Sequence, residues 1–94
     1  MRTVSVLLWG QLKLLAQTDS VSLGICAPYG VEDAIRSLVD SYAALKALLI
    51  NDDGTCRKSI LVFVNGAQWS WDTEKVLEEA AEITLMSPIA GGQG

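Results

Sequence analysis

The sequence predicts an α+β domain in which a mixed sheet of four or five strands carries one main helix on one face. Two observations lead to this fold class. Several short segments alternate between apolar and polar residues with a period of two, and one long segment repeats its apolar residues at helical spacing. The chain has 94 residues, 50% of them hydrophobic, which is enough for one domain with its own core and too few for two.

The first two strands are predicted at residues 3–9 and 20–26, where apolar and polar residues alternate. Their apolar faces comprise Val4, Val6, Leu8, Val21, Leu23 and Ile25. Residues 10–19 join the two strands as a turn with room for one helical turn. We therefore expect a hairpin whose link is longer than a tight turn.

One helix is predicted over residues 31–49, because apolar residues recur there every three or four positions. The resulting stripe comprises Val31, Ile35, Leu38, Tyr42, Leu45 and Leu49. Glu32 and Asp33 in the first turn, and Lys46 near the end, carry the charges that the helix dipole favours. The loop at residues 51–55 ends this helix.

A strand at residues 59–66 is almost entirely apolar, which predicts a central strand covered on both faces. Its last two residues, Asn65 and Gly66, form a two-residue hairpin signal. A short return strand is therefore expected at residues 67–71, with Trp69 and Trp71 on one side.

Residues 72–81 form an acidic turn, with a short helix as an option. The last strand is predicted at residues 82–86, with Ile83 and Leu85 facing inward, and Pro88 stops it. We expect the first and last strands to lie side by side at the centre of the sheet, which is the β-grasp, or ubiquitin-like, architecture. Residues 1–90 are assigned to this domain and residues 91–94 to a flexible C-terminal glycine tail.

The composition argues against several classes of function. The net charge of −4 disfavours binding to nucleic acid, which needs clustered Lys and Arg, and binding to an anionic membrane. Because the chain has no histidine, the usual metal ligand and the usual general base are missing, and catalysis by a Ser–His or Cys–His pair is excluded. We expect no bound metal and no bound cofactor.

Cys26 and Cys56 form no CxxC motif, and we expect them to be reduced thiols in a cytoplasmic protein, with relay of sulfur as a minor alternative. The sequence shows no signal peptide and no apolar run long enough to span a membrane.

Three stretches, in this order, resemble the MoaD/ThiS group of ubiquitin-like sulfur carriers, and most of all the small subunit of molybdopterin synthase. VLLWGQLKLLAQTD resembles the first strand of that family and its G-x-L-R-E-L-A-G-x-D segment. LVFVNG resembles the family's central strand and V-N-G turn, and LEEAAEITLMSPIAGG resembles L-x-D-G-D-E-V-x-x-x-P-P-V-x-G-G. This chain departs from the pattern at Lys13-Leu14 (commonly Arg-Glu), at Ala80-Ala81 (Gly-Asp), at Ser87 (the first of two prolines) and at Gln93-Gly94, which follow the glycine pair.

The resemblance implies a function for the Gly91-Gly92 pair. An E1-like enzyme would use ATP to adenylate the carboxyl group of Gly92, and a sulfur donor would convert it to a thiocarboxylate. The chain would then be a carrier and not an enzyme by itself. It would pass its sulfur to the large subunit of molybdopterin synthase or to another sulfur-accepting enzyme. Carriers for thiamine or for cysteine and methionine biosynthesis, and a ubiquitin-like protein modifier, are the alternatives, as is an interaction module with a vestigial tail.

The two residues after the glycine pair, Gln93 and Gly94, hold the Gly92 carboxyl group in an amide bond. We expect a protease to remove them. Direct use of Gly94 as the reactive end and an inactive tail are the alternatives.

A partner surface is predicted from alternation, which turns Trp9 and Met86 away from the apolar faces of their strands. With Pro88 and Ile89, which lead into the tail, they are the candidate partner-binding residues. Burial of Trp9 under a loop is the alternative.

Overall fold

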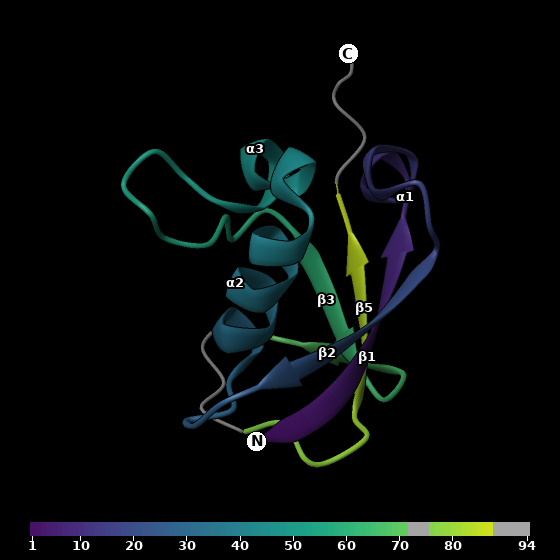
Figure 1. Ribbon diagram of the computed structural model, residues 1–94, viewed down its shortest axis with the longest axis vertical. Helices are drawn as coiled ribbons and strands as arrows, with labels where there is room; N and C mark the ends of the chain where they lie inside the picture. The colour runs from purple at the N-terminus through teal and green to yellow at the C-terminus, as the bar shows by residue number, and fades with distance from the viewer. Residues whose placement is uncertain (72–75, 88–94) are drawn as a thin grey trace.

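The structure, a computed structural model, describes residues 1–71 and 76–87. The five strands are β1 (Arg2–Trp9), β2 (Ser20–Ile25), β3 (Leu61–Val64), β4 (Ala67–Trp69) and β5 (Glu82–Met86). The helices are α1 (Gln11–Ala16), α2 (Val31–Ser41), the 3-10 turn η1 (Ala43–Leu45) and α3 (Lys46–Leu49). The strands form one sheet in the order β2-β1-β5-β3-β4, and α2 lies across one of its faces (Figure 1).

The sheet is mixed, as predicted. β1 and β5 run parallel at its centre, whereas β2 pairs with β1, β3 with β5 and β4 with β3 in antiparallel fashion. The first and last strands are therefore neighbours, and the predicted β-grasp architecture is confirmed. The hairpin at Asn65 and Gly66 is also confirmed, since both residues have positive φ angles (53° and 86°), as a tight turn between paired strands requires.

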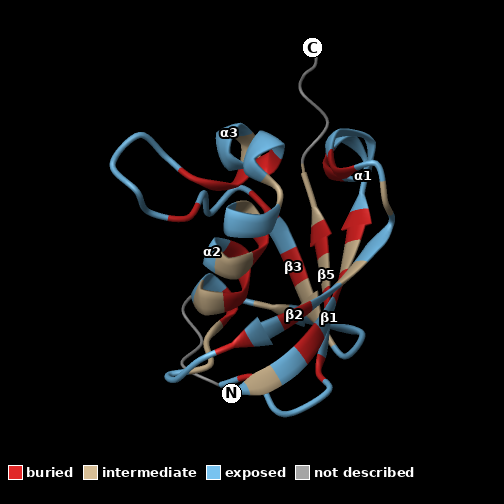
Figure 2. Cartoon of the chain, viewed as in Figure 1, coloured by how far each residue is buried: buried red, intermediate tan, exposed pale blue. Residues whose placement is uncertain are grey.

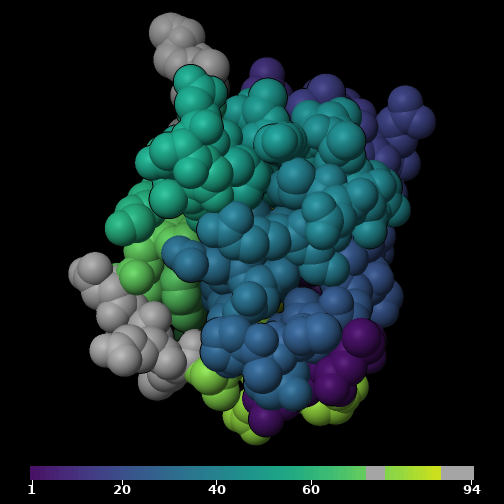
Figure 3. All heavy atoms as spheres, turned by 60° about the vertical axis from the view of Figure 1, so that its left-hand side comes forward, coloured from purple at the N-terminus to yellow at the C-terminus, as the bar shows by residue number. Residues whose placement is uncertain are grey.

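The core fills the space between α2 and the inner face of the sheet, where the buried residues gather in Figure 2. Val4, Val6 and Leu8 of β1 are at most 2% exposed, and Ile83 and Leu85 of β5 are each 1% exposed. The inward faces assigned to these two strands are thus confirmed. Seen from the helical side, α2 and the segment that follows it form the surface (Figure 3).

The single helix predicted over residues 31–49 is wrong. α2 ends at Ser41, Tyr42 leaves the helical region (φ −130°, ψ 79°), and η1 and α3 continue in a new direction. The change of direction brings η1 into contact with both α1 and α2, and this buries Leu45 completely. The predicted apolar stripe nevertheless faces the core, because each short helix turns its own part of the stripe inward.

The expectation that the strand at residues 59–66 is covered on both faces is also wrong. β3 spans only Leu61–Val64, and Leu61 is 45% exposed. In Figure 1, α2 and α3 lie on one side of the sheet and α1 lies at the end of β1, so no helix of the described residues covers the outer face. The return strand is likewise shorter than predicted and ends at Trp69.

The predicted acidic turn falls partly outside the described residues, at 72–75, and residues 76–81 contain no helix. The described part of this turn forms hydrogen bonds with the beginning of β1. The Ala80 N–H donates to the Thr3 carbonyl (2.7 Å), the Thr3 N–H donates to the Glu79 carboxylate (3.1 Å), and the Arg2 guanidinium donates to the Leu77 carbonyl (2.6 Å).

Candidate functional site

The outer face of the sheet carries an apolar patch at one end. Strand alternation and register align Trp9 of β1, Met86 of β5 and Leu61 of β3 in one row across three adjacent strands. Leu7 and Phe63 lie in the next row, on either side of Thr84. We call Leu7, Trp9, Leu61, Phe63 and Met86 the outer patch.

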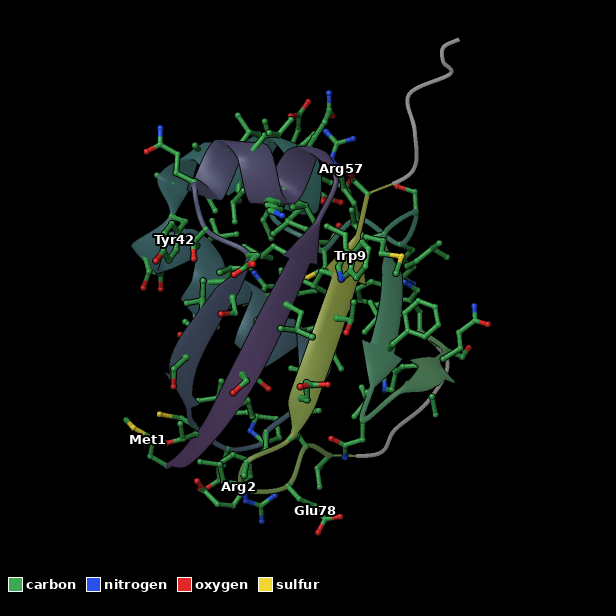
Figure 4. The ribbon with its side chains drawn as sticks, turned by 90° about the vertical axis from the view of Figure 1, so that its right-hand side faces the viewer. Met1, Arg2, Trp9, Tyr42, Arg57 and Glu78 are labelled. Atoms are coloured by element: carbon green, nitrogen blue, oxygen red, sulfur yellow. The ribbon has the colours of Figure 1, made fainter. Side chains whose placement is uncertain are left out.

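The outer patch is accessible. Trp9 is 55% exposed and Leu61 45% exposed, and the other three residues are half-buried. Figure 4 shows Trp9 on this open face, at the end of β1. Large apolar side chains such as Trp9 and Met86 that are accessible to solvent on a sheet are typical of a surface that binds another protein.

The rest of the outer face is polar. The next rows toward the other end of the sheet contain Ser5, Ser22 and Glu82. The apolar side chains of this face are therefore confined to the end at which β1 and β5 finish.

The outer patch adjoins the point where the chain leaves the sheet. β5 ends at Met86, and Ser87 is the last described residue before the segment 88–94. A Cβ atom placed on Gly10 would lie 3.6 Å from the Ser87 hydroxyl, so the end of β5 lies against the junction between Trp9 and α1. In Figure 1, β5 ends between α1 and α3 at the same end of the molecule.

Of the predicted site residues, the structure brings Trp9 and Met86 together as direct neighbours, both on the outer face. The other predicted site residues, which are Pro88, Ile89, Gly91, Gly92, Gln93 and Gly94, lie outside the described residues. Leu61 and Phe63 were missed because the continuous apolar run of their strand gives no indication of which side faces water. Leu14 (75% exposed) and Leu15 (46% exposed) of α1 were missed as well.

The other chemically active side chains form no second site. Within the described ranges, no group of three or more Cys, Asp or Glu residues is placed to hold a metal ion, and no helix is long and apolar enough to cross a membrane. Cys26 is exposed, whereas Cys56 is buried, and burial raises the pKa of the Cys56 thiol. Trp69 and Trp71 pack edge to face with ring centroids 5.0 Å apart, and Trp69 faces the core side of β4, opposite Val62.

No protein-family model matches this chain, and no curated protein sequence matches it. Solved structures do. Small archaeal modifier protein 1 (SAMP1) from Haloferax volcanii is 26% identical with a TM-score of 0.83, covering 96% of this chain and 99% of that one. SAMP1 from Methanosarcina acetivorans is 27% identical with a TM-score of 0.80, covering 98% of each chain. Urm1 from Trypanosoma brucei is 26% identical with a TM-score of 0.71, covering 97% of this chain and 96% of that one.

These similarities extend over nearly the whole of each chain. The chain is thus a β-grasp protein whose structural neighbours are ubiquitin-like sulfur carriers and modifiers, the group that its sequence resembles.

Proposed function

We propose that this chain is a sulfur carrier whose Gly92 carboxyl group is adenylated and then converted to a thiocarboxylate. The observation that supports the proposal is the outer patch, which adjoins the end of the strand that leads into Ser-Pro-Ile-Ala-Gly-Gly. An enzyme that holds the patch also holds the origin of that segment. In our proposal the sulfur serves molybdopterin biosynthesis, with the large subunit of molybdopterin synthase as the acceptor.

A protease first hydrolyses the Gly92–Gln93 amide bond, which frees the Gly92 carboxylate. The chemistry then needs only that carboxylate from this chain. A Gly92 carboxylate oxygen attacks the α-phosphorus of ATP, and pyrophosphate leaves. A sulfide-class donor then attacks the carbonyl carbon of the acyl adenylate, AMP leaves with the oxygen, and the donor's proton goes to solvent. The E1-like enzyme supplies the catalytic groups, which agrees with the absence of histidine in the sequence.

The spacing between the outer patch and Gly92 sets how close the enzyme must come. Gly92 lies five residues beyond Ser87, and five extended residues span at most about 18 Å. A catalytic pocket that reaches Gly92 must therefore lie within about 18 Å of the end of β5. In our proposal, an enzyme that comes this close also covers the outer patch. Gly91 and Gly92 have no Cβ atom, which lets the end of the segment pass through a narrow channel.

The experiment compares the full chain with a chain that ends at Gly92. Each is incubated with ATP, sulfide and the E1-like enzyme of the source organism, and mass spectrometry then looks for replacement of one terminal oxygen by sulfur. We expect replacement at Gly92 in the shorter chain, and slower replacement, at Gly94, in the full chain, because Gln93 and Gly94 displace the free carboxylate by about 7 Å. If neither chain gains sulfur, the carrier proposal fails. Equal rates would mean that removal of Gln93-Gly94 is not needed.

The outer patch is tested separately with Trp9→Asp. Because Trp9 is 55% exposed, the variant is expected to fold, and we expect it to lose binding to the E1-like enzyme. Ser22→Asp, on the same face outside the patch, is the matched control and should bind normally. Unchanged affinity for a folded Trp9→Asp variant would remove the outer patch from the proposal.

A second candidate function is that of a protein modifier, because two of the structural neighbours are named as modifier proteins. In that case the carbonyl group of Gly92 would end in an amide bond to a lysine of another protein. Adducts of higher mass that resist reductant would support the modifier function. A thiocarboxylate without such adducts would favour the carrier. A sulfur carrier for thiamine synthesis, or for cysteine and methionine synthesis, would have the same thiocarboxylate at Gly92 and would differ only in the acceptor enzyme.

A further inference from the structure

The helix α1 has six residues, and two adjacent leucines on it, Leu14 and Leu15, are exposed. Leu12 and Ala16 face the core, with 0% and 9% exposure, and hold the helix in place. Leu14 is 75% exposed and Leu15 is 46% exposed. Single exposed leucines are ordinary on protein surfaces, so their location decides whether this pair has a function.

The leucine pair lies at the end of the molecule where β5 finishes. α1 follows Trp9 after one residue, Gly10, and Gly10 is the residue that lies against Ser87. Figure 4 shows α1 across this end of the sheet, immediately above Trp9.

A groove joins α1 to the outer patch. It has a volume of about 480 Å³ and is lined by Leu7 and Trp9 of the patch, by Lys13 of α1, and by Gly10, Asp19 and Ser20 between and beside them. The outer patch therefore does not end at Trp9. The groove connects it to α1 at Lys13, the residue that precedes Leu14 and Leu15.

We propose that Leu14 and Leu15 form a second apolar contact for the adenylating enzyme that takes the C-terminal segment. The inference rests on the proposed function. An enzyme that reaches Gly92 must come within about 18 Å of Ser87, and α1 borders Ser87 through Gly10. An enzyme that also contacts the outer patch then has α1 directly beside its surface. The exposed side chains of α1 include Leu14 and Leu15, so we expect the enzyme surface to be apolar opposite this leucine pair.

Leu14 also gives this contact a selective role. The sulfur-carrier pattern that the sequence resembles commonly has Glu at this position, whereas this chain has Leu. An enzyme surface that buries Leu14 would leave a glutamate carboxylate desolvated and unpaired, which is costly. The pair therefore favours an enzyme matched to this chain over one matched to a carrier with an acidic α1.

The test measures the affinity of the purified E1-like enzyme of the source organism for four proteins: the natural chain and the variants Leu14→Glu, Leu14→Met and Val76→Glu. We expect Leu14→Glu to raise Kd at least about tenfold, and Leu14→Met to keep Kd within about twofold, since an apolar side chain of similar size is retained. Val76→Glu is the matched control. Val76 is apolar and 53% exposed. It precedes Leu77, whose carbonyl accepts a hydrogen bond from Arg2, at the end of β1 opposite Trp9. Its Kd should not change.

A second measurement does not depend on how the charged variant folds. A photoreactive benzophenone side chain is placed at position 14 in one sample and at position 76 in another. We expect cross-links to the enzyme from position 14 only. An unchanged Kd for folded Leu14→Glu, or equal cross-linking from both positions, would overturn the inference while the carrier function stands. If the natural chain does not bind the enzyme at all, the proposed function fails and this inference fails with it.

Discussion

Ala80 has a left-handed backbone that an alanine adopts only at a cost. Its φ angle is +67°, and it stands where the resembling family pattern has glycine. We predict that Ala80→Gly stabilises the protein. The hydrogen bond from the Ala80 N–H to the Thr3 carbonyl (2.7 Å) belongs to the backbone, so the substitution keeps it. The methyl group that is lost is exposed and contributes little packing.

The size of the gain follows from two opposing contributions. A left-handed conformation costs an L-residue about 1–2 kcal/mol, which glycine avoids. Glycine also makes the unfolded chain more flexible, which costs about 0.5–1 kcal/mol. The free energy of unfolding should therefore rise by about 0.75 kcal/mol, the midpoint of a range from about 0 to 1.5 kcal/mol, and the midpoint raises Tm by roughly 3–6 °C for a domain of this size.

The assay is urea denaturation followed by circular dichroism, with thermal melting as a second measure. Ala47→Gly serves as the control, because Ala47 is also exposed but lies in α3. Glycine in a helix should lower the free energy of unfolding by about 0.5–1 kcal/mol, so the same substitution gives opposite signs at the two positions. A destabilised Ala80→Gly variant would refute the argument that backbone strain at this turn governs the effect.

Three further predictions concern single side chains. Leu38→Ala should lower the free energy of unfolding by about 2–5 kcal/mol in urea denaturation, because Leu38 is fully buried on the core side of α2, and a loss under about 0.5 kcal/mol would contradict this packing. A thiol reagent should label Cys26 rapidly and Cys56 only after unfolding, since Cys56 is buried and its thiol pKa is raised; rapid labelling of both thiols would contradict this. Asp53 accepts hydrogen bonds from the hydroxyl and N–H of Thr55 (2.6 and 3.0 Å), which lower its pKa, so its stabilisation is present above the ordinary Asp pKa and is lost as pH falls through the lowered value. An NMR titration should show this low midpoint, and Thr55→Val should raise it.

The strands could be predicted from the sequence because alternation reports directly on which side chains face the core. Val4, Val6 and Leu8 were placed correctly in this way, and so was the exposed Trp9 on the opposite side. Alternation on β1 and β5 thus also located one part of the candidate site, although it did not show that Trp9 and Met86 are direct neighbours, since pairing of distant strands is not a local property.

The remaining differences have physical causes. Helical spacing indicates which residues face the core, but it does not indicate the direction of the helix axis. The break at Tyr42 therefore cannot be predicted from the apolar residues, because they keep their spacing on both sides of it. In β3 both faces are apolar, and only the position of α2 on the other face of the sheet explains why Leu61 meets water. Leu14 and Leu15 belong to a helix too short to establish a period of its own.

The parallel pairing of β1 with β5 has a consequence for protein synthesis. β1 is made before β2, β3 and β4, and its central neighbour β5 is made after them, so the sheet stays divided into the pairs β2-β1 and β3-β4 until β5 is complete. A two-stranded sheet is marginal on its own, and contacts between distant parts of a chain form late in folding. Translation that stops before residue 82 would therefore yield no assembled row of Trp9, Met86 and Leu61. Only a polypeptide translated through β5 would display the surface, so a partner that binds it would ignore unfinished products of the ribosome.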